Sequence, residues 1–187
     1  MNDVPFLLKQ AASIVERVQQ SDEYTEIMRR MRPMHRFHLT GIGKSGLAAE
    51  RAAATWRSFG IDATYEHATE LLHGGLGGVF GAFMFVLSHT GNTRECLEVV
   101  RAIKAETLTG ADTIAITSSG DSPLALACNY DIIYDVGSDT PLAHGLPVLA
   151  NYVQAGILDS IGLDLIQRHG VTKEMVKEWH PQGTHIK

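Results

Sequence analysis

The sequence predicts an α/β fold, a three-layer sandwich in which a five-stranded parallel sheet lies between layers of helices. From Arg36 onward, short apolar runs with the length of buried strands alternate with segments whose apolar residues recur at helical spacing. Strands joined by crossover helices form parallel sheets that are covered on both faces. The chain has 187 residues and shows no repeat or linker, which favours one domain with a sizeable core.

Helices are expected before the first strand. Apolar side chains recur at helical spacing from Phe6 to about Met31. Ser21 or Asp22 can cap a second helix, which Pro33 ends. These N-terminal helices can cover either the sheet or a partner subunit.

Five strands are expected in the core, each a short apolar or β-branched run. They are Phe37–Thr40, Ala63–Tyr65, Phe83–Leu87, Thr113–Thr117 and Asp131–Tyr134. One helix is expected from the Gly41–Gly46 turn to about Phe59, another begins at Glu95, and a short one follows Pro123. Further helices are expected from Pro147 through Ile161, over Leu163–His169 and over Thr172–Glu178. The single domain thus comprises an N-terminal helical extension (1–35), an α/β core (36–170) and a C-terminal helix and tail (171–187).

The overall composition excludes several classes of partner. A net charge of -5 argues against nucleic acid, whose phosphates need a basic face. No apolar run approaches the roughly 20 residues that span a bilayer, and the N-terminus lacks the pattern of a signal peptide. Cys96 and Cys128 have no partner spacing and are expected to be buried free thiols. The chain is therefore predicted to be cytoplasmic, with no membrane or nucleic-acid partner.

The segment Ser88–Glu95 is the most informative stretch of the chain. It joins the strand ending at Leu87 to a helix in which Cys96 and Val99 begin an apolar face. The turn carries hydroxyl groups and a glycine, and Glu95 follows at the start of the helix. Hydroxyls and unpaired backbone N–H groups at a helix N-terminus bind phosphate readily. The turn is therefore predicted to hold a sugar phosphate whose protons Glu95 moves, although threonines here can also serve only as helix caps.

A second strand-to-helix turn, Gly41–Gly46, matches the letters of the dinucleotide fingerprint, with Glu66 about 20 residues further on. A nicotinamide or flavin oxidoreductase is therefore one alternative, and a turn that needs glycines only for its geometry is another. It is not a Walker loop, because His38 occupies the position of the first glycine. Lys44 inside the loop favours a bound monophosphate.

The histidines of the chain do not predict a metal site. His67 and His73 have no third ligand at a recognised spacing, so neither a metal nor another cofactor is expected. Taken alone, His73 is typical of a loop histidine bonded to backbone, and His180 of a solvated chain end.

Three turns of the chain resemble the sugar isomerase (SIS) domain. They are Gly41–Gly46, Ser88–Glu95 and Ile116–Ala125. Within that family, His67–Gly77 and His180–Gly183 resemble the arabinose 5-phosphate isomerase branch. The similarity runs from about Phe37 to Gly183.

The resemblance implies a site and an assembly. The family's fold is a five-stranded parallel sheet flanked by helices, usually assembled as a homotetramer with active sites at subunit interfaces. The positions that would bind the substrate phosphate are Ser45, Ser88, His89, Thr90 and Thr93. The positions that match the catalytic residues of the branch are Lys44, His73, Glu95 and His180.

The sequence departs from that branch in three places. The branch usually carries a glutamate where this chain has Ser138, and Asp139 lies beside it. The following segment, Pro141–Pro147, also differs from the branch's usual Pro-Leu-Gly-Leu-Ala-Pro-Thr. The paired CBS modules common at the C-terminus of the branch are expected to be absent, since the sequence stops at Lys187. These differences leave the exact substrate open.

The hypothesis for function is an aldose–ketose phosphate isomerase, an intramolecular oxidoreductase that interconverts arabinose 5-phosphate and ribulose 5-phosphate through a cis-enediol. Glu95 would serve as the base, and Lys44 would neutralise the phosphate or the developing enediolate. His73 and His180 would assist ring opening or proton movement between oxygens. The alternatives are a hexulose-phosphate isomerase and a non-catalytic phosphosugar sensor.

Overall fold

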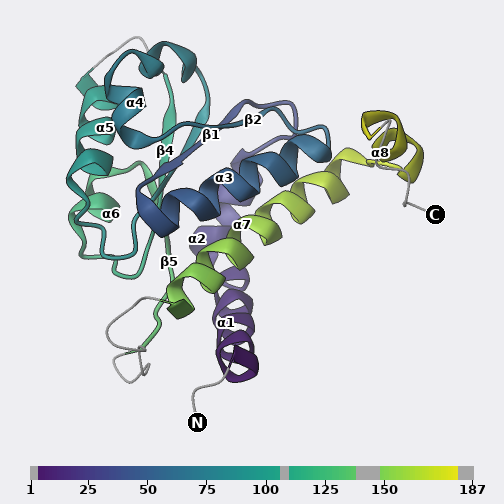
Figure 1. The fold of residues 1–187 in the computed structure, drawn as a ribbon, viewed down its shortest axis with the longest axis horizontal. Helices are drawn as coiled ribbons and strands as arrows, with labels where there is room; N and C mark the ends of the chain where they lie inside the picture. Colours follow the sequence, from purple (N-terminus) through teal and green to yellow (C-terminus); the bar gives the residue numbers. More distant parts are fainter. Residues whose placement is uncertain (1–3, 106–109, 138–147, 181–187) are drawn as a thin grey trace.

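The computed structural model describes residues 4–105, 110–137 and 148–180. Within these ranges the chain forms a five-stranded sheet in which every paired strand is parallel, in the order β2-β1-β3-β4-β5 (Figure 1). The strands are β1 (Phe37–Gly41), β2 (Ala63–Tyr65), β3 (Phe83–Leu87), β4 (Asp112–Thr117) and β5 (Tyr130–Ile133). The predicted fold class and all five strands are confirmed, with ends that differ by one residue at most.

The order of the strands creates a switch point between β1 and β3. These two strands pair along their whole length, from Phe37 opposite Phe83 to Gly41 opposite Leu87. From β1 the chain crosses to β2 on one side, whereas from β3 it continues to β4 and β5 on the other. Open α/β sheets bind ligands beyond the carboxyl ends of the strands at such a reversal.

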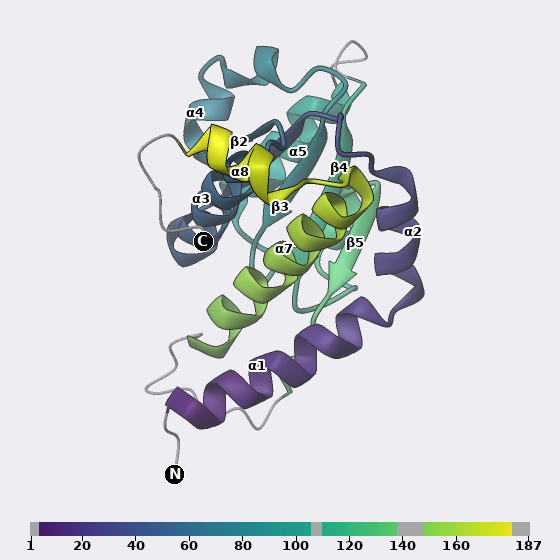
Figure 2. The ribbon, with the colours of Figure 1, turned by 90° about the vertical axis from the view of Figure 1, so that its right-hand side faces the viewer.

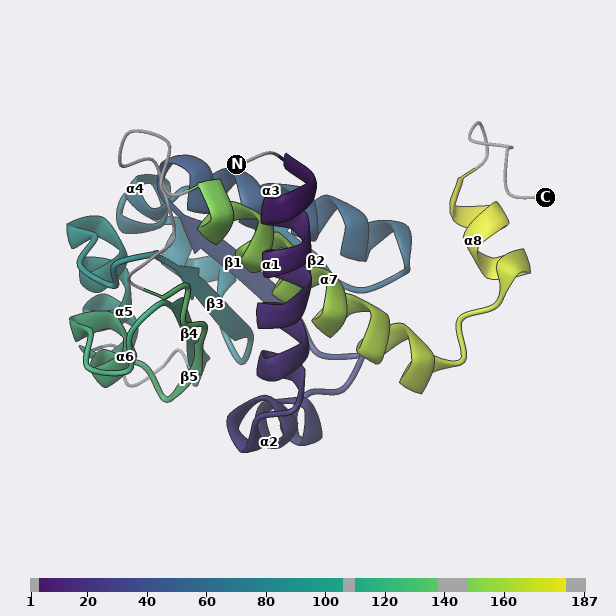
Figure 3. The ribbon, with the colours of Figure 1, turned by 90° about the horizontal axis from the view of Figure 1, so that it is seen from below.

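One face of the sheet packs against four helices, α1 (Val4–Gln19), α2 (Asp22–Arg30), α3 (Gly43–Ser58) and α7 (Val148–His169). Figures 2 and 3 show α1 crossing α7, and α2 beside β5. The core of this layer includes an aromatic cluster in which Trp56 meets Phe37 and Phe85 edge-on, at ring-centroid distances of 5.5 and 5.7 Å. The N-terminal helices therefore cover the sheet of their own chain.

The other face packs against α4 (Ala68–Leu72), α5 (Arg94–Ala105) and α6 (Pro123–Ala127). Side chains alternate along β3, so that Phe83, Phe85 and Leu87 point to the first layer while Met84 and Val86 point to the second. Both faces are apolar because both are covered, as the near-continuous apolar runs of the strands predict.

The prediction that the helix after Pro147 ends near Ile161 is wrong. A single helix, α7, runs through that point to His169. Gly162 lies inside it, and a Cβ there would be 2.5 Å from Nε1 of Trp56. The glycine is therefore a close-packing position rather than a helix stop, and the indole N–H of Trp56 donates to the Leu158 carbonyl at 3.1 Å.

Two short elements between β2 and β3 were not predicted from the sequence. They are α4 and the 3-10 helix η1 (Gly75–Gly78), each too short to show a periodic pattern. The predicted C-terminal helix is present as α8 (Lys173–Trp179), capped by the Thr172 hydroxyl. None of the helices in the described ranges has the length and apolar character needed to cross a bilayer.

Candidate functional site

Two helix N-termini lie side by side at the switch point. Strand β1 ends at Gly41 and α3 begins at Gly43, whereas β3 ends at Leu87 and α5 begins at Arg94. Because Gly41 and Leu87 are register partners, the two turns leave the sheet next to each other. The first turn of a helix presents N–H groups without intrahelical partners. This edge of the sheet therefore presents backbone N–H donors from the first turns of both helices.

The turn between β3 and α5 is held by its own hydroxyl groups. Ser88 Oγ is 2.8 Å from Thr93 Oγ1 and accepts from the Gly91 N–H at 3.1 Å. Thr90 Oγ1 accepts from the Asn92 N–H at 3.3 Å, and Thr90 is exposed. The hydroxyl of Thr93 thus contacts Ser88. If Thr93 served only as a helix cap, its hydroxyl would instead accept a hydrogen bond from a backbone N–H of the helix. A hydroxyl retains further hydrogen-bonding capacity, so Thr93, which is half-buried, can still bond to a ligand, whereas Ser88 is 3% exposed.

A third turn, after β4, supports this one from below. The His89 carbonyl accepts from the Ser118 N–H at 3.0 Å, from Ser118 Oγ at 2.7 Å and from Thr117 Oγ1 at 3.2 Å. Gly91 has φ +65°, and a Cβ on it would lie 2.3 Å from Ser122 Oγ. The turn within Ile116–Ala125 therefore positions the Ser88–Glu95 turn by packing against it, a role that the sequence alone does not indicate.

The glycines of the β1–α3 turn have packing roles. A Cβ on Gly46 would lie 2.8 Å from the Gly41 carbonyl oxygen and 2.8 Å from the Tyr65 hydroxyl. Gly43, with φ +59°, has open space around it, and the adjacent Lys44 is exposed. Ser45, half-buried, follows in the first turn of α3. The dinucleotide-like spacing of the glycines is thus accounted for by close approach of α3 to β1.

Glu66, which the dinucleotide alternative would place on a ribose, packs elsewhere. A Cβ on Gly75 would come within 2.0 Å of Glu66 Oε1, so the carboxylate lies against the loop after α4. That loop begins with the exposed His73, at the C-terminus of α4. His67 caps the N-terminus of the same helix, its Nδ1 accepting from the Thr69 N–H. His73 therefore follows the carboxyl end of β2, the strand next to β1.

Glu95 lies in the first turn of α5 and is half-buried. The neighbouring Arg94 pairs with Glu98, its Nε lying 2.7 Å from Glu98 Oε1. Glu98, three residues on, is thus already engaged by Arg94, whereas Glu95 forms no ion pair among the described residues. The structure thus places Lys44, Ser45 and Glu95 in the first turns of two helices that leave neighbouring strand ends, whereas His73 lies at the C-terminus of α4.

His180 does not join them within one chain. It follows α8, whose Trp179 ring packs onto Gly60, so that a Cβ there would be 2.4 Å from the indole. Gly60 lies just beyond the C-terminal end of α3, whereas Lys44 lies in the first turn of that helix. A helix of 16 residues is about 24 Å long, so the two ends of α3 are far apart. Figure 1 shows α8 beyond this far end.

The ring of His89 packs against Tyr134. The imidazole stacks on Tyr134 with ring centroids 6.0 Å apart, and its Nδ1 is 3.2 Å from the Tyr134 hydroxyl. Burial lowers the pKa of His89 below its ordinary value, which favours the neutral ring near pH 7. As a phosphate ligand, His89 would therefore offer a neutral N–H rather than a positive charge.

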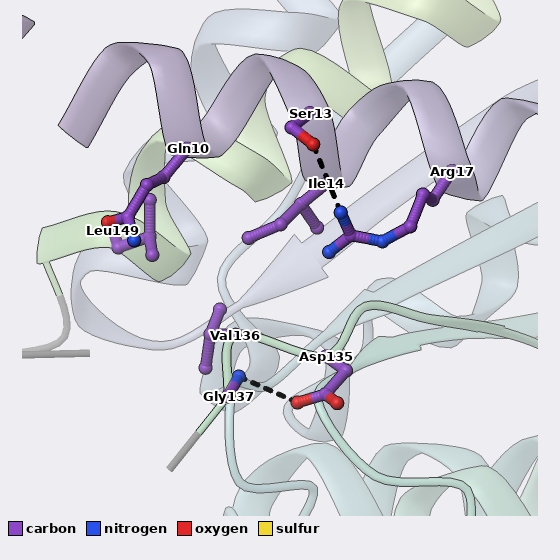
Figure 4. A pocket seen from close by; sticks show the side chains of 8 residues that line it. All are labelled: Gln10, Ser13, Ile14, Arg17, Asp135, Val136, Gly137 and Leu149. Atoms are coloured by element: carbon purple, nitrogen blue, oxygen red, sulfur yellow. Dashed lines mark hydrogen bonds between the residues drawn. The ribbon is translucent and has the colours of Figure 1, made fainter. Parts of the chain in front are cut away.

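A hollow of about 290 Å³ lies beyond the end of β5, between it and α1 (Figure 4). Arg17 Nη1 donates to Ser13 Oγ at 3.0 Å and the Gly137 N–H donates to Asp135 Oδ1 at 2.7 Å, whereas the buried Oε1 of Gln10 has no hydrogen-bond partner among the described residues. None of the predicted site residues lines it. The turns at the switch point are the stronger candidate for an anion site.

The described residues contain no cluster of three or more histidine, cysteine or acidic side chains that could hold a metal ion. Cys96 is buried and Cys128 half-buried, and both are free thiols. Burial raises the pKa of each thiol to about 12. Neither has the thiolate character that a nucleophilic cysteine needs. The predicted glutamate-equivalent position, Ser138, and its neighbour Asp139 lie outside the described residues.

Comparison with known proteins identifies the family. The SIS domain matches residues 30–158, and the chain belongs to the SIS domain family. Over 146 residues it is 29% identical to the arabinose 5-phosphate isomerase KdsD of Pseudomonas aeruginosa and 27% identical to the arabinose 5-phosphate isomerase GutQ of Escherichia coli K12. Each alignment covers 78% of this chain and 44% of the relative, so the chain spans less than half the length of these curated relatives.

Solved structures share the fold along nearly the whole chain. The protein c3406 of E. coli CFT073, solved in complex with A5P, has a TM-score of 0.82 and 26% identity, covering 97% of this chain and 100% of its own. NanR of Vibrio vulnificus, solved with ManNAc-6P, has a TM-score of 0.74 at 18% identity, covering 98% of this chain and 70% of its own. At that lower identity the likeness to NanR concerns the fold alone.

Proposed function

We propose that this chain is a phosphosugar isomerase that interconverts an aldose phosphate and a ketose phosphate, with arabinose 5-phosphate and ribulose 5-phosphate as the first candidate pair. The observation that carries the proposal is the pairing of two helix N-termini at the β1/β3 switch point, one bearing Lys44 and Ser45 and the other the hydroxyls of residues 88–93 and Glu95. The A5P complex of c3406, which is 26% identical over 97% of this chain, supports the choice of sugar.

The phosphate would bind between the two turns. Unpaired N–H groups at the start of α5 and the hydroxyls of Ser88, Thr90 and Thr93 supply neutral donors. Ser45 and Lys44 would approach from α3, with the ammonium of Lys44 neutralising charge on the phosphate or on the enediolate. This binding places the sugar carbons beside the first turn of α5.

Glu95 would transfer the proton between adjacent carbons. Its carboxylate takes the proton from C2 of the open-chain aldose, and the electron pair of that C–H bond forms the C1=C2 bond of a cis-enediol as the carbonyl oxygen gains a proton. The reverse movement delivers the proton to C1, while the C2 hydroxyl loses its proton and becomes the ketone carbonyl. His73 would assist ring opening or proton movement between the two oxygens.

His180 would come from a neighbouring subunit. It lies at the far end of α3 from Lys44, so a complete set of the four proposed catalytic residues requires a second chain. We therefore propose a homo-oligomer, with a tetramer as the expected state and sites at the interfaces. Light scattering that returned a monomer under assay conditions would contradict this arrangement.

A hexulose phosphate is the second candidate substrate, and a phosphosugar sensor is the second candidate function. The replacement of the branch glutamate by Ser138 favours the sensor, because it removes one carboxylate from the site. The combination of Lys44 and Glu95 at one sheet edge, with His73 matching the branch in sequence, favours the enzyme, since binding alone requires no base.

Incubation with a panel of aldose and ketose phosphates in deuterated water, followed by NMR, distinguishes these possibilities. An isomerase that uses one base converts a substrate to its partner and incorporates deuterium at the carbon that receives the proton. Tight binding of a phosphosugar with no conversion and no deuterium uptake would instead identify a sensor. Failure to bind any member of the panel would contradict both.

A further inference from the structure

A line of three hydrogen-bonded side chains leads from the Ser88–Glu95 turn into the core. Nδ1 of His89 is 3.2 Å from the hydroxyl oxygen of Tyr134, and that oxygen accepts from Nε2 of Gln154 at 2.9 Å. Tyr134 is 0% exposed and Gln154 1% exposed. A buried polar group costs free energy unless it forms hydrogen bonds, so the bonds between these side chains restrict how each group can be oriented.

The end of β4 holds both ends of the contact in place. The hydroxyl of Thr117 donates to the His89 carbonyl at 3.2 Å, and the Tyr134 N–H donates to the Thr117 carbonyl at 3.1 Å. The backbones of His89 and Tyr134 are thus anchored to one residue, although 45 positions separate them in sequence. The stacked rings, with an interplanar angle of 23°, have little freedom to separate.

The donors and acceptors fix the direction of each bond. Gln154 uses its amide N–H toward Tyr134, so the Tyr134 oxygen accepts there. Burial raises the pKa of Tyr134, so the phenol keeps its proton and has to donate it. Among the described residues the acceptor left for that proton is Nδ1 of His89. If His89 donated instead, the buried phenol O–H would lack an acceptor, which costs about 1–3 kcal/mol.

A neutral imidazole that accepts at one nitrogen carries its proton on the other. We infer that Tyr134 and Gln154 are positioning residues that hold His89 in the tautomer protonated at Nε2, so that the Ser88–Glu95 turn presents a fixed neutral N–H donor to an oxygen of the phosphosugar. This role rests on the proposed function, whereas the tautomer itself does not. The donor adds a directional hydrogen bond to a site otherwise built from hydroxyls, backbone N–H groups and Lys44.

The tautomer is measured directly by nitrogen-15 NMR of the histidine rings, because the shifts of the two ring nitrogens and their couplings to the ring protons differ between tautomers. The full-length protein, labelled at histidine and recorded at pH 8, should show His89 protonated at Nε2, with the signal assigned by its loss in His89→Gln. A wild-type spectrum with His89 protonated at Nδ1 would overturn the inference without any variant.

Substitution then tests the cause. Tyr134→Phe keeps the stacked ring and removes the hydroxyl, so His89 should become a mixture of tautomers. Tyr130→Phe is the matched control, since Tyr130 begins β5, four residues before Tyr134, and its ring contacts Arg30 at 5.0 Å rather than His89. Unchanged His89 shifts in Tyr134→Phe would show that the hydroxyl does not hold the ring.

Binding of arabinose 5-phosphate and of inorganic phosphate, measured by calorimetry, tests the positioning role. Loss of one neutral hydrogen bond should weaken arabinose 5-phosphate about five- to tenfold in His89→Ala, with part of the loss recovered in His89→Gln, whose amide N–H can replace Nε2–H. Equal affinity in wild type and His89→Ala would overturn the role. Absence of binding to wild type, with the Nε2–H tautomer present, would instead count against the proposed function.

Discussion

At the scale of single residues, His38 is a titratable group buried far from the candidate site. It lies on β1, is 5% exposed, and its Nδ1 has no hydrogen-bond partner among the described residues. Burial lowers the pKa of His38 below its ordinary value, and the nearby Arg36 acts in the same direction. Asp62 and the Gly78 backbone oppose the shift but do not cancel it.

This shift predicts loss of stability in mild acid. Below about pH 6.5, His38 binds a proton in the unfolded chain but stays neutral in the folded chain. The free energy of unfolding therefore falls as the pH drops from about 6.5 toward the lower pKa that His38 has in the folded protein. One such group contributes at most about 1.4 kcal/mol per pH unit. Urea denaturation at pH 8 and pH 5.5 should show a larger loss for wild type than for His38→Leu. Equal losses would indicate that His38 titrates normally; His89, which burial shifts the same way, is present in both proteins.

The polar residues of the site could be located from the sequence more readily than their contacts. A strand-turn-helix pattern was enough to predict Ser88, Thr90 and Thr93 at one helix N-terminus. The bond between Ser88 and Thr93 could not be predicted, because it depends on the backbone path through Gly91. The contact of His89 with Tyr134 depends on β4 and β5 lying beside β3, which local patterns do not specify.

At the scale of helices and strands, the continuity of α7 shows where local rules fail. A glycine inside a helix costs roughly 0.5–1 kcal/mol relative to alanine, which made Gly162 a reasonable end point. Packing against the fully buried Trp56 requires a residue without Cβ there, and buried side chains on both sides of the glycine, at Ile161 and Leu165, keep the helix continuous. Tertiary packing thus outweighs propensity at this position, whereas α4 and η1 escaped prediction simply because they are short.

Gly162→Ala should therefore destabilise the protein, although it improves helix propensity. Overpacking of this kind costs about 1–3 kcal/mol, because the indole has no room to move. Chemical denaturation of Gly162→Ala, Trp56→Phe and the double variant should show a smaller total loss in the double variant than the sum of the single ones, since the smaller ring relieves the overlap. A stabilised Gly162→Ala protein would contradict the packing account.

At the scale of the whole molecule, the strand order determines what the separate turns can do together. Alternating strands and helices predicted a parallel sheet, but not that β1 and β3 would be neighbours. That adjacency brings Lys44 and Glu95, 51 positions apart in sequence, to one edge of the sheet. His180 lies at the opposite end of α3, and the expectation of sites shared between subunits came from the resemblance to the family rather than from any local pattern.

The central claim, that Glu95 is the base beside the bound phosphate, is tested most directly by Glu95→Gln. The substitution keeps the size of the side chain and removes its ability to accept a proton, so turnover of the phosphosugar and deuterium uptake should fall about 10²–10⁴-fold while binding is retained. Glu98→Gln is the matched control, one turn along α5 and paired with Arg94, and should keep near wild-type turnover. Near-normal turnover in Glu95→Gln would contradict the assignment.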